Sequence, residues 1–345
     1  MKDFLPIPSI YYSELFVCYM VHGGSTVDIK KNISDNHKLM AQFLKIVRTF
    51  FYAFFLFTVF TGCGNEQEKD TGDNGTIYIS ADESFKPVID SQIQVYEARH
   101  PGKKIIPLYK PESACIKDLM VDSIRLVIIT RKFSPDEENA IVDSFKVGPK
   151  FRVVAKDAVA VIVNPKAPDS LFTMNELKDV LQGRFKKDLI PIFDATRATS
   201  TVRFIIDSVL HGDSLTSKAR GVSSSEGVID YVSKTPGAIG FVGVSWVGNH
   251  EDTMQTSFLK KVKIAQLEST DTKGNYVLPV QANIYYRRYP MIRDVVSILK
   301  ERNSDGLGHS FASFLSNEIG QKIFWRAYLI PALQNFSRRS VSAEE

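Results

Sequence analysis

Apolar strand-like runs alternate with helix-like segments from Thr76 onward, and this alternation constrains the fold more than any other feature of the chain. Predicted strands at Thr76–Ala81, Lys104–Leu108 and Leu126–Thr130 are interleaved with predicted helices at Phe85–Arg99 and Ser113–Asp122. Parallel strands need long crossover connections, which helices usually supply. The sequence therefore predicts an α/β fold with a mainly parallel sheet.

The same alternation continues through the second part of the chain. The β-branched run Val153–Val163 is followed by a capping box, Thr173-Met-Asn-Glu176, which opens a helix that Gly183 closes. Further predicted elements are helices at Thr201–Leu210, Ser225–Ser233, Leu307–Leu315 and Asn317–Tyr328, a strand at Ala238–Val242, and Met291–Arg302, which fits a helix or a strand. Ligands of such folds bind beyond the carboxyl ends of the strands.

The composition excludes several classes of protein. A chain with 44% hydrophobic residues can build a core, so it is not intrinsically disordered. The balance of 43 Lys and Arg against 39 Asp and Glu lacks the basic excess of a nucleic-acid-binding protein. The chain has no P-loop, nucleophile elbow, HExxH or GxGxxG motif, and its three cysteines form no CxxC pair. We therefore expect no nucleic acid, no metal, no cofactor and no catalytic residue.

An export signal is predicted at 40–62. Lys45 and Arg48 precede the apolar run Thr49–Phe60, and Thr61-Gly62 then precedes Cys63. The run is shorter than the roughly 20 residues that span a bilayer as a helix. The small residues before Cys63 resemble a bacterial lipobox, which implies cleavage before Cys63 and its lipidation. The alternative is a buried or membrane-anchoring helix with a chance cysteine.

The segments on either side of this signal are predicted to lack a fold. A signal peptide should begin near its charged residues, so we interpret 1–39 as a non-native or unstructured extension. The alternative is a genuine extension of unknown role. Residues 63–75 are polar and are predicted to be a tether.

Three predicted strand-to-helix loops are rich in hydroxyl groups: Asp82–Phe85, Arg197–Thr201 and Ser223–Ser225. Helix N-termini attract anions because their N–H groups are unpaired, and an arginine adds a two-pronged donor. Loops of this kind that meet in a cleft would bind a small oxyanion. Each loop taken singly is more typical of an ordinary helix cap, and Arg197 makes the middle loop as typical of an anion site as of a cap.

Several segments, in order along the chain, resemble the substrate-binding lipoproteins of bacterial phosphate ABC importers. They are Ile79–Phe85, Tyr96–Pro101, Ile129–Arg131, Ala155–Asn164, Thr173–Gly183, Thr199–Thr201, Ser225–Val232, Thr235–Val242, Tyr289–Pro290 and Glu318–Lys322. The resemblance implies a type II periplasmic-binding fold, in which two α/β lobes flank a cleft and are joined by a two-strand hinge. It places lobe 1 at 76–153 and 266–335, and lobe 2 at 154–265.

The resemblance also implies which residues hold the ligand, which in this family is dehydrated phosphate. The residues carried over are Ser84, the N–H of Phe85, Thr130, Arg131, Thr199, Ser200, Thr201 and Arg197, with Arg203 as a rival to Arg197. Ser200 stands where the family has glycine, and we find no match to the family's acidic acceptor.

Glu112 stands where the family has small residues. A carboxylate near a bound dianion repels it unless a proton lies between them. Glu112 in the cleft would therefore favour hydrogen phosphate over sulfate. The alternative is that Glu112 points to solvent.

We expect a monomeric, lipid-anchored binding protein of the cell envelope, facing the periplasm or in the outer membrane, that delivers phosphate or a similar oxyanion to an ABC permease. The alternatives are a diverged sensor, adhesion or regulatory lipoprotein of the same fold and, less favoured, a phosphohydrolase. The absence of an identifiable nucleophile and base counts against the enzyme.

Overall fold

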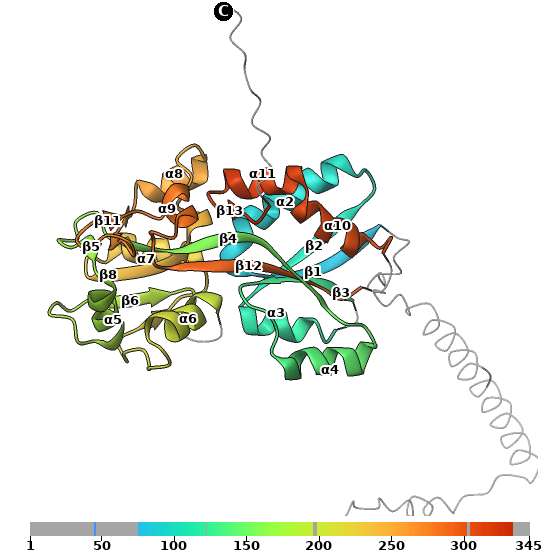
Figure 1. Ribbon diagram of the computed structural model, residues 1–345, viewed down its shortest axis with the longest axis horizontal. Helices are drawn as coiled ribbons and strands as arrows, with labels where there is room; N and C mark the ends of the chain where they lie inside the picture. The colour runs from blue at the N-terminus through green and yellow to red at the C-terminus, as the bar shows by residue number, and fades with distance from the viewer. Residues whose placement is uncertain (1–44, 46–74, 122, 196–198, 302–303, 334–345) are drawn as a thin grey trace, which may run out of the picture. The chain divides into compact units, whose positions relative to one another are not determined.

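A mixed sheet of ten strands organises the part of the chain that the structure describes (Figure 1). The computed structural model describes residue 45 and residues 75–121, 123–195, 199–301 and 304–333. Apart from Lys45, these belong to the unit Lys69–Glu345. The predicted extension, the rest of the export signal, Cys63 and Arg197 lie outside the described residues. Within these ranges, no helix is both long and apolar enough to cross a membrane.

The strands of the large sheet run in the order β2-β1-β3-β12-β4-β8-β6-β7, with β9 and β13 also paired to β4. They are β1 (Thr76–Asp82), β2 (Lys104–Lys110), β3 (Ile124–Ile129), β4 (Lys150–Val163), β6 (Ile190–Phe193), β7 (Arg220–Gly221), β8 (Ala238–Gly243), β9 (Lys263–Ile264), β12 (Ile292–Leu299) and β13 (Ile330–Pro331). A small second sheet contains β5 (Leu171–Phe172), β10 (Gln266–Glu268) and β11 (Tyr276–Val277).

β4 divides the large sheet into two parts. Residues 150–158 of β4 pair with β12, and residues 159–163 pair with β8. We call β2-β1-β3-β12 with the first part of β4 the first half-sheet, and the rest of β4 with β8, β6 and β7 the second half-sheet. Figure 1 shows β4 and β12 running across the middle of the view.

The prediction of a mainly parallel sheet is right for the outer strands of each half-sheet and wrong for every pair that involves β4 or β12. β1 pairs in parallel with β2 and β3, and β6 pairs in parallel with β7 and β8. In contrast, β12 is antiparallel to both β3 and β4, and β4 is antiparallel to β8. The reason is that the chain leaves the first half-sheet along β4 and returns to it along β12 in the opposite direction.

The helices are α2 (Lys86–Arg99), α3 (Glu112–Asp118), α4 (Pro135–Phe145), α5 (Met174–Gln182), α6 (Ser200–Phe204), α7 (Ser225–Lys234), α8 (Thr253–Leu259), α9 (Gln281–Tyr285), α10 (Leu307–Ser316) and α11 (Glu318–Arg326). Short 3₁₀ turns are η1 (Glu83–Phe85) and η3 (Val244–Trp246), and a π-helical turn, η2 (Ile205–Val209), follows α6. The helix predicted at Thr201–Leu210 therefore changes its winding midway. The undecided segment at Met291–Arg302 contains strand β12, and α4 had no sequence prediction.

Local capping explains two of these boundaries. The predicted capping box is confirmed, because Thr173 and Glu176 bond to each other's backbone N–H, and Gly183 ends α5 with a φ of 75° that glycine adopts without strain. At the start of α2, by contrast, the N-cap residue Phe85 makes no side-chain cap, and Asp82 caps the preceding turn η1.

The small second sheet joins segments that the sequence assigned to different lobes. Gln266–Glu268 of β10 pairs with Leu171–Phe172 of β5. The first of these segments was expected in lobe 1 and the second in lobe 2. The lobe boundaries themselves stay a prediction.

Candidate functional site

Residues of the turns and the helix that follow β1, β6 and β8 contact one another between the two half-sheets. The Ser84 hydroxyl, in the turn after β1, lies 3.3 Å from that of Ser200 and 3.5 Å from that of Thr201, at the start of α6. Trp246, after β8, donates its indole N–H to the Ser84 carbonyl at 2.9 Å. All four side chains are buried. The first two hydroxyl-rich loops therefore meet in the structure.

An arginine that the sequence analysis missed lies beside these hydroxyls. Arg293 of β12 and Asp157 of β4 form an ion pair with 2.8 Å between Nε and Oδ2, and their side chains are 2% and 0% exposed. Nη1 of Arg293 donates to the Ser200 hydroxyl at 3.0 Å. Among the described residues, Nη2 of Arg293 is the one buried side-chain nitrogen without a hydrogen-bond partner. Buried polar groups are nearly always paired, so this N–H can donate to a bound group.

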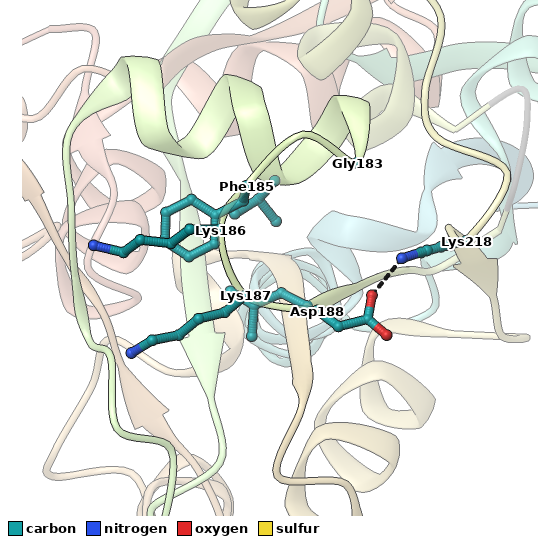
Figure 2. Close-up of a pocket in the computed structure, with 8 residues that line it drawn as sticks. Gly183, Phe185, Lys186, Lys187, Asp188 and Lys218 are labelled. Atoms are coloured by element: carbon teal, nitrogen blue, oxygen red, sulfur yellow. Dashed lines mark hydrogen bonds and ion pairs between the residues drawn. The ribbon is translucent and has the colours of Figure 1, made fainter.

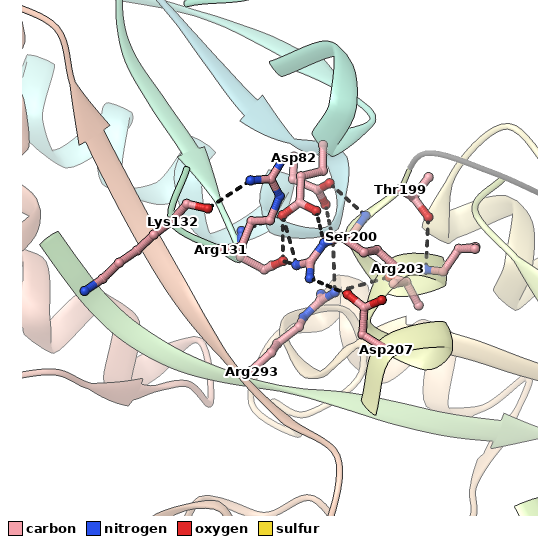
Figure 3. Close-up of polar contacts among 12 residues, drawn as sticks. Asp82, Arg131, Lys132, Thr199, Ser200, Arg203, Asp207 and Arg293 are labelled. Atoms are coloured by element: carbon pink, nitrogen blue, oxygen red, sulfur yellow. Dashed lines mark hydrogen bonds and ion pairs between the residues drawn. The ribbon is translucent and has the colours of Figure 1, made fainter. Parts of the chain in front are cut away.

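A buried carboxylate, Asp82, accepts from the same loops. It accepts from the Ser84 N–H at 3.0 Å, from the Ser200 hydroxyl at 2.9 Å and from the Ser200 N–H at 3.4 Å. Figure 3 shows Asp82, Ser200 and Arg293 brought together from three different elements. Burial raises the pKa of Asp82, although Arg293 opposes this shift.

Asp194 is a further buried acid, at the end of β6. The Thr199 hydroxyl donates to it at 2.9 Å. Burial, followed by the charge of Asp82, raises the pKa of Asp194 to about 7. Thr199 also caps α6 by accepting from the N–H of Val202, so it acts on neighbouring protein groups.

A second polar cluster lies around Glu112, at the start of α3. One carboxylate oxygen accepts from the N–H and the hydroxyl of Thr130 at 2.8 and 2.6 Å, and the other accepts from Nε of Arg203 at 2.6 Å. Glu112 is 2% exposed, so the alternative that it points to solvent is wrong. Burial raises its pKa, but the donors from Arg203 and Thr130 outweigh burial and hold the pKa of Glu112 below its ordinary value.

The remaining predicted residues have other partners or other surroundings. Arg131 makes two bonds to Glu137, at 2.7 and 2.8 Å, and so supports the first turn of α4. The N–H and hydroxyl of Ser225, in the third hydroxyl-rich loop, donate to Glu83. The ring of Phe85 is fully buried and lies 5.2 Å from the Arg293 guanidinium.

The sequence analysis missed four central residues: Asp82, Asp157, Asp194 and Arg293. Two of them had a usable signal. Asp157 interrupts an apolar run that must be buried, and a buried acid requires a cationic or hydrogen-bonding partner. Arg293 likewise stands in a mainly apolar segment, between Ile292 and Val295, and a buried cation also requires a partner.

A surface pocket elsewhere is lined by residues of the α5–β6 connection and by Lys218 (Figure 2). Lys218 is paired with Asp188, and Lys187 with Asp169. In the part of the chain that the structure describes, no group of three or more His, Cys, Asp or Glu residues has an arrangement that could hold a metal ion.

Comparison with known proteins places these features in context. A model of the PBP superfamily domain matches residues 66–318. The phosphate-binding protein PstS of Borreliella burgdorferi is 20% identical over 270 residues, which cover 74% of this chain and 89% of that protein.

Two solved structures have a similar fold. One is a protein from Clostridium perfringens assigned as a phosphate ABC transporter substrate-binding protein and solved with bound phosphate. Its TM-score is 0.61 and its sequence identity is 20%, and the match covers 75% of this chain and 100% of that one. The other, an ABC-type phosphate transport receptor from Vibrio cholerae, has a TM-score of 0.56 and 19% identity, over 74% of this chain and 99% of that one.

Proposed function

Because the chain belongs to the PBP superfamily, we propose that it is an extracytoplasmic binding protein that holds phosphate, or a similar oxyanion, between its two half-sheets. The observation that carries this proposal is the unpaired Nη2 of Arg293, a buried cationic donor on a guanidinium that also bonds to the Ser200 and Thr201 hydroxyls. An oxyanion oxygen at this position would supply the missing acceptor and would be stabilised by the guanidinium charge.

The hydroxyls of Ser84, Ser200 and Thr201 complete the proposed site. They come from both half-sheets, so a ligand that bonds to all three would hold the half-sheets together. Ligand contacts that exist only in the closed arrangement would shift the protein toward closure. This part of the proposal needs no catalytic group, and it agrees with the names of the relatives, which describe phosphate binding and transport.

The proposal includes the setting in which the protein works. We propose cleavage before Cys63, lipidation of Cys63, and a monomer held at the cell envelope that passes its ligand to an ABC permease. Support comes from the charged, apolar and small residues that precede Cys63.

Calorimetric titration with phosphate, sulfate and molybdate in phosphate-free buffer tests the proposal. We expect phosphate to bind, and the double substitution Ser200→Ala/Thr201→Ala to weaken binding strongly while the fold is retained. The matched control is Ser257→Ala in α8, whose hydroxyl bonds locally to the Met254 carbonyl. If phosphate binds equally well to the double variant, the site assignment is wrong.

One observation favours a second function, a diverged sensor of the same fold. Asp82 already accepts hydrogen bonds from Ser84 and Ser200, so the donors of the site have an acceptor within the chain. If none of the three oxyanions binds at any pH, the sensor is favoured over the transport receptor.

A further inference from the structure

The carboxylate of Asp82 takes hydrogen bonds that a bound oxyanion would use. Its oxygens accept from the N–H of Ser84 in the first half-sheet, and from the N–H and hydroxyl of Ser200 in the second. Asp82 is 1% exposed. An ionised carboxylate is itself a small oxyanion, and here it lies among donors of the kind that such a ligand needs.

The charges around Asp82 oppose the arrival of a second anion. The titratable and charged groups that act on it or respond to it are Arg293 of β12, Glu112 and Cys115 of α3, Glu83 of η1, and Asp194 after β6. Arg293 is the nearby cation, and it is shared with Asp157. A dianion beside an ionised Asp82 would therefore be poorly compensated in a buried place.

We infer, on the basis of the proposed function, that Asp82 is a specificity-determining residue. In its ionised form Asp82 competes with the ligand for the Ser84 and Ser200 donors. An oxyanion therefore enters together with a proton that it shares with Asp82. The proton comes from solvent, and no bond other than O–H forms or breaks. Whichever of the two oxygens carries this proton, the occupied site gains one unit less of negative charge than it would gain from the anion alone.

The inference has a direct consequence for pH. As pH rises, ionised Asp82 becomes more populated, and the apparent affinity for the anion falls because the competent form is scarcer. Asp82→Asn keeps the size of the side chain and removes its negative charge. It should therefore bind phosphate more tightly than the wild type at high pH. Comparison at the same pH cancels the titration of phosphate itself.

The experiment is calorimetric titration of phosphate into the full chain and into Asp82→Asn between pH 6 and 9, in two buffers with different ionisation enthalpies. At pH 8 the wild type should take up about one proton per phosphate and Asp82→Asn close to none, while the variant binds about tenfold or more tightly. Asp118→Asn is the charge control, since Asp118 bonds to Ser80 and Lys110 and not to Ser84 or Ser200. It should behave as the wild type does.

The outcomes separate this inference from the proposed function. If the wild type binds phosphate but takes up no proton, or if Asp82→Asn binds no more tightly than the wild type at pH 8, the inference is overturned and the proposed function stands. Binding by Asp82→Asn alone would support the inference. If neither protein binds phosphate at any pH, the proposed function is overturned and the inference falls with it. The number of protons that the wild type takes up on binding phosphate tests the inference even if the variant does not fold.

Discussion

Arg293 and Asp157 are direct partners across β12 and β4, and their side chains form an ion pair with 2.8 Å between Nε and Oδ2. Both side chains are almost fully buried, and β4 is the strand that both half-sheets share. The same guanidinium reaches Ser200 at the start of α6. One residue thus contributes to the junction of the sheet and to the proposed ligand site.

Arg293→Met should destabilise the protein strongly, because it leaves the carboxylate of Asp157 buried without its partner. We expect a loss of about 3–5 kcal/mol in the free energy of unfolding at neutral pH, measured by urea denaturation. Lys86→Met, which breaks the exposed pair with Asp90, should cost less than about 1 kcal/mol. Equal costs for the two substitutions would show that the buried pair does not support the fold.

Arg203→Ala should also destabilise the protein, in a pH-dependent way. The pKa of Glu112 lies below its ordinary value in the folded protein, so its ionised form contributes stability above the unfolded-state pKa, and this contribution is lost as pH falls. We expect a loss of about 2 kcal/mol at pH 7, reduced because Arg203 is partly exposed. The loss should shrink below about pH 4. Thermal melts across pH measure it, and a loss that is constant with pH would contradict the assignment.

Asp194 should make the protein less stable as pH rises. Its pKa in the folded state is raised to about 7, so the folded state binds more protons than the unfolded state between the two pKa values. The free energy of unfolding therefore falls as pH rises from about 4 to about 7. Asp194→Asn should reduce this slope. The control is Asp230→Asn, which removes a half-exposed carboxylate paired with Lys234 and should leave the slope unchanged. A slope that is equally steep in Asp194→Asn would count against the prediction.

Gly243→Ala should weaken phosphate binding while the protein still folds. A Cβ at Gly243 would lie 3.4 Å from Nη2 of Arg293 and 3.3 Å from both the Ser84 carbonyl oxygen and Oδ2 of Asp157. It would thus crowd the N–H that we propose for the ligand. We expect about a tenfold loss of affinity, or about 1.4 kcal/mol, by calorimetry. Gly237→Ala meets only the Asp188 carbonyl oxygen, at 3.6 Å, and should bind as the wild type does. A normal affinity in Gly243→Ala would place the ligand elsewhere.

Helices and strands were predicted well where the sequence signal lies within the element itself. The Thr173–Glu176 capping box and Gly183 located α5, and the long β-branched run located β4, because caps and β-branched residues act on their own segment. Segment 291–302 was ambiguous because a central strand of this sheet is buried on both faces, and such a strand loses its alternation.

The candidate site was only partly predictable, because some of its contacts join segments that are far apart in the sequence. Helix-start patterns indicated Ser84, Ser200 and Thr201, since a hydroxyl at a helix N-terminus is a local feature. The pairing of Asp157 with Arg293 depends instead on the register of two strands far apart in sequence. Glu112 and Arg203 were both identified as candidates, but their pairing was not predicted, because that contact crosses between the half-sheets.

A crystal structure of the protein grown with phosphate tests the central claim most directly. The account predicts one phosphate between the half-sheets, with an oxygen within hydrogen-bond distance of Nη2 of Arg293 and with contacts to the hydroxyls of Ser84, Ser200 or Thr201. Phosphate bound away from Arg293, or an empty cleft under conditions in which calorimetry detects binding, would contradict it.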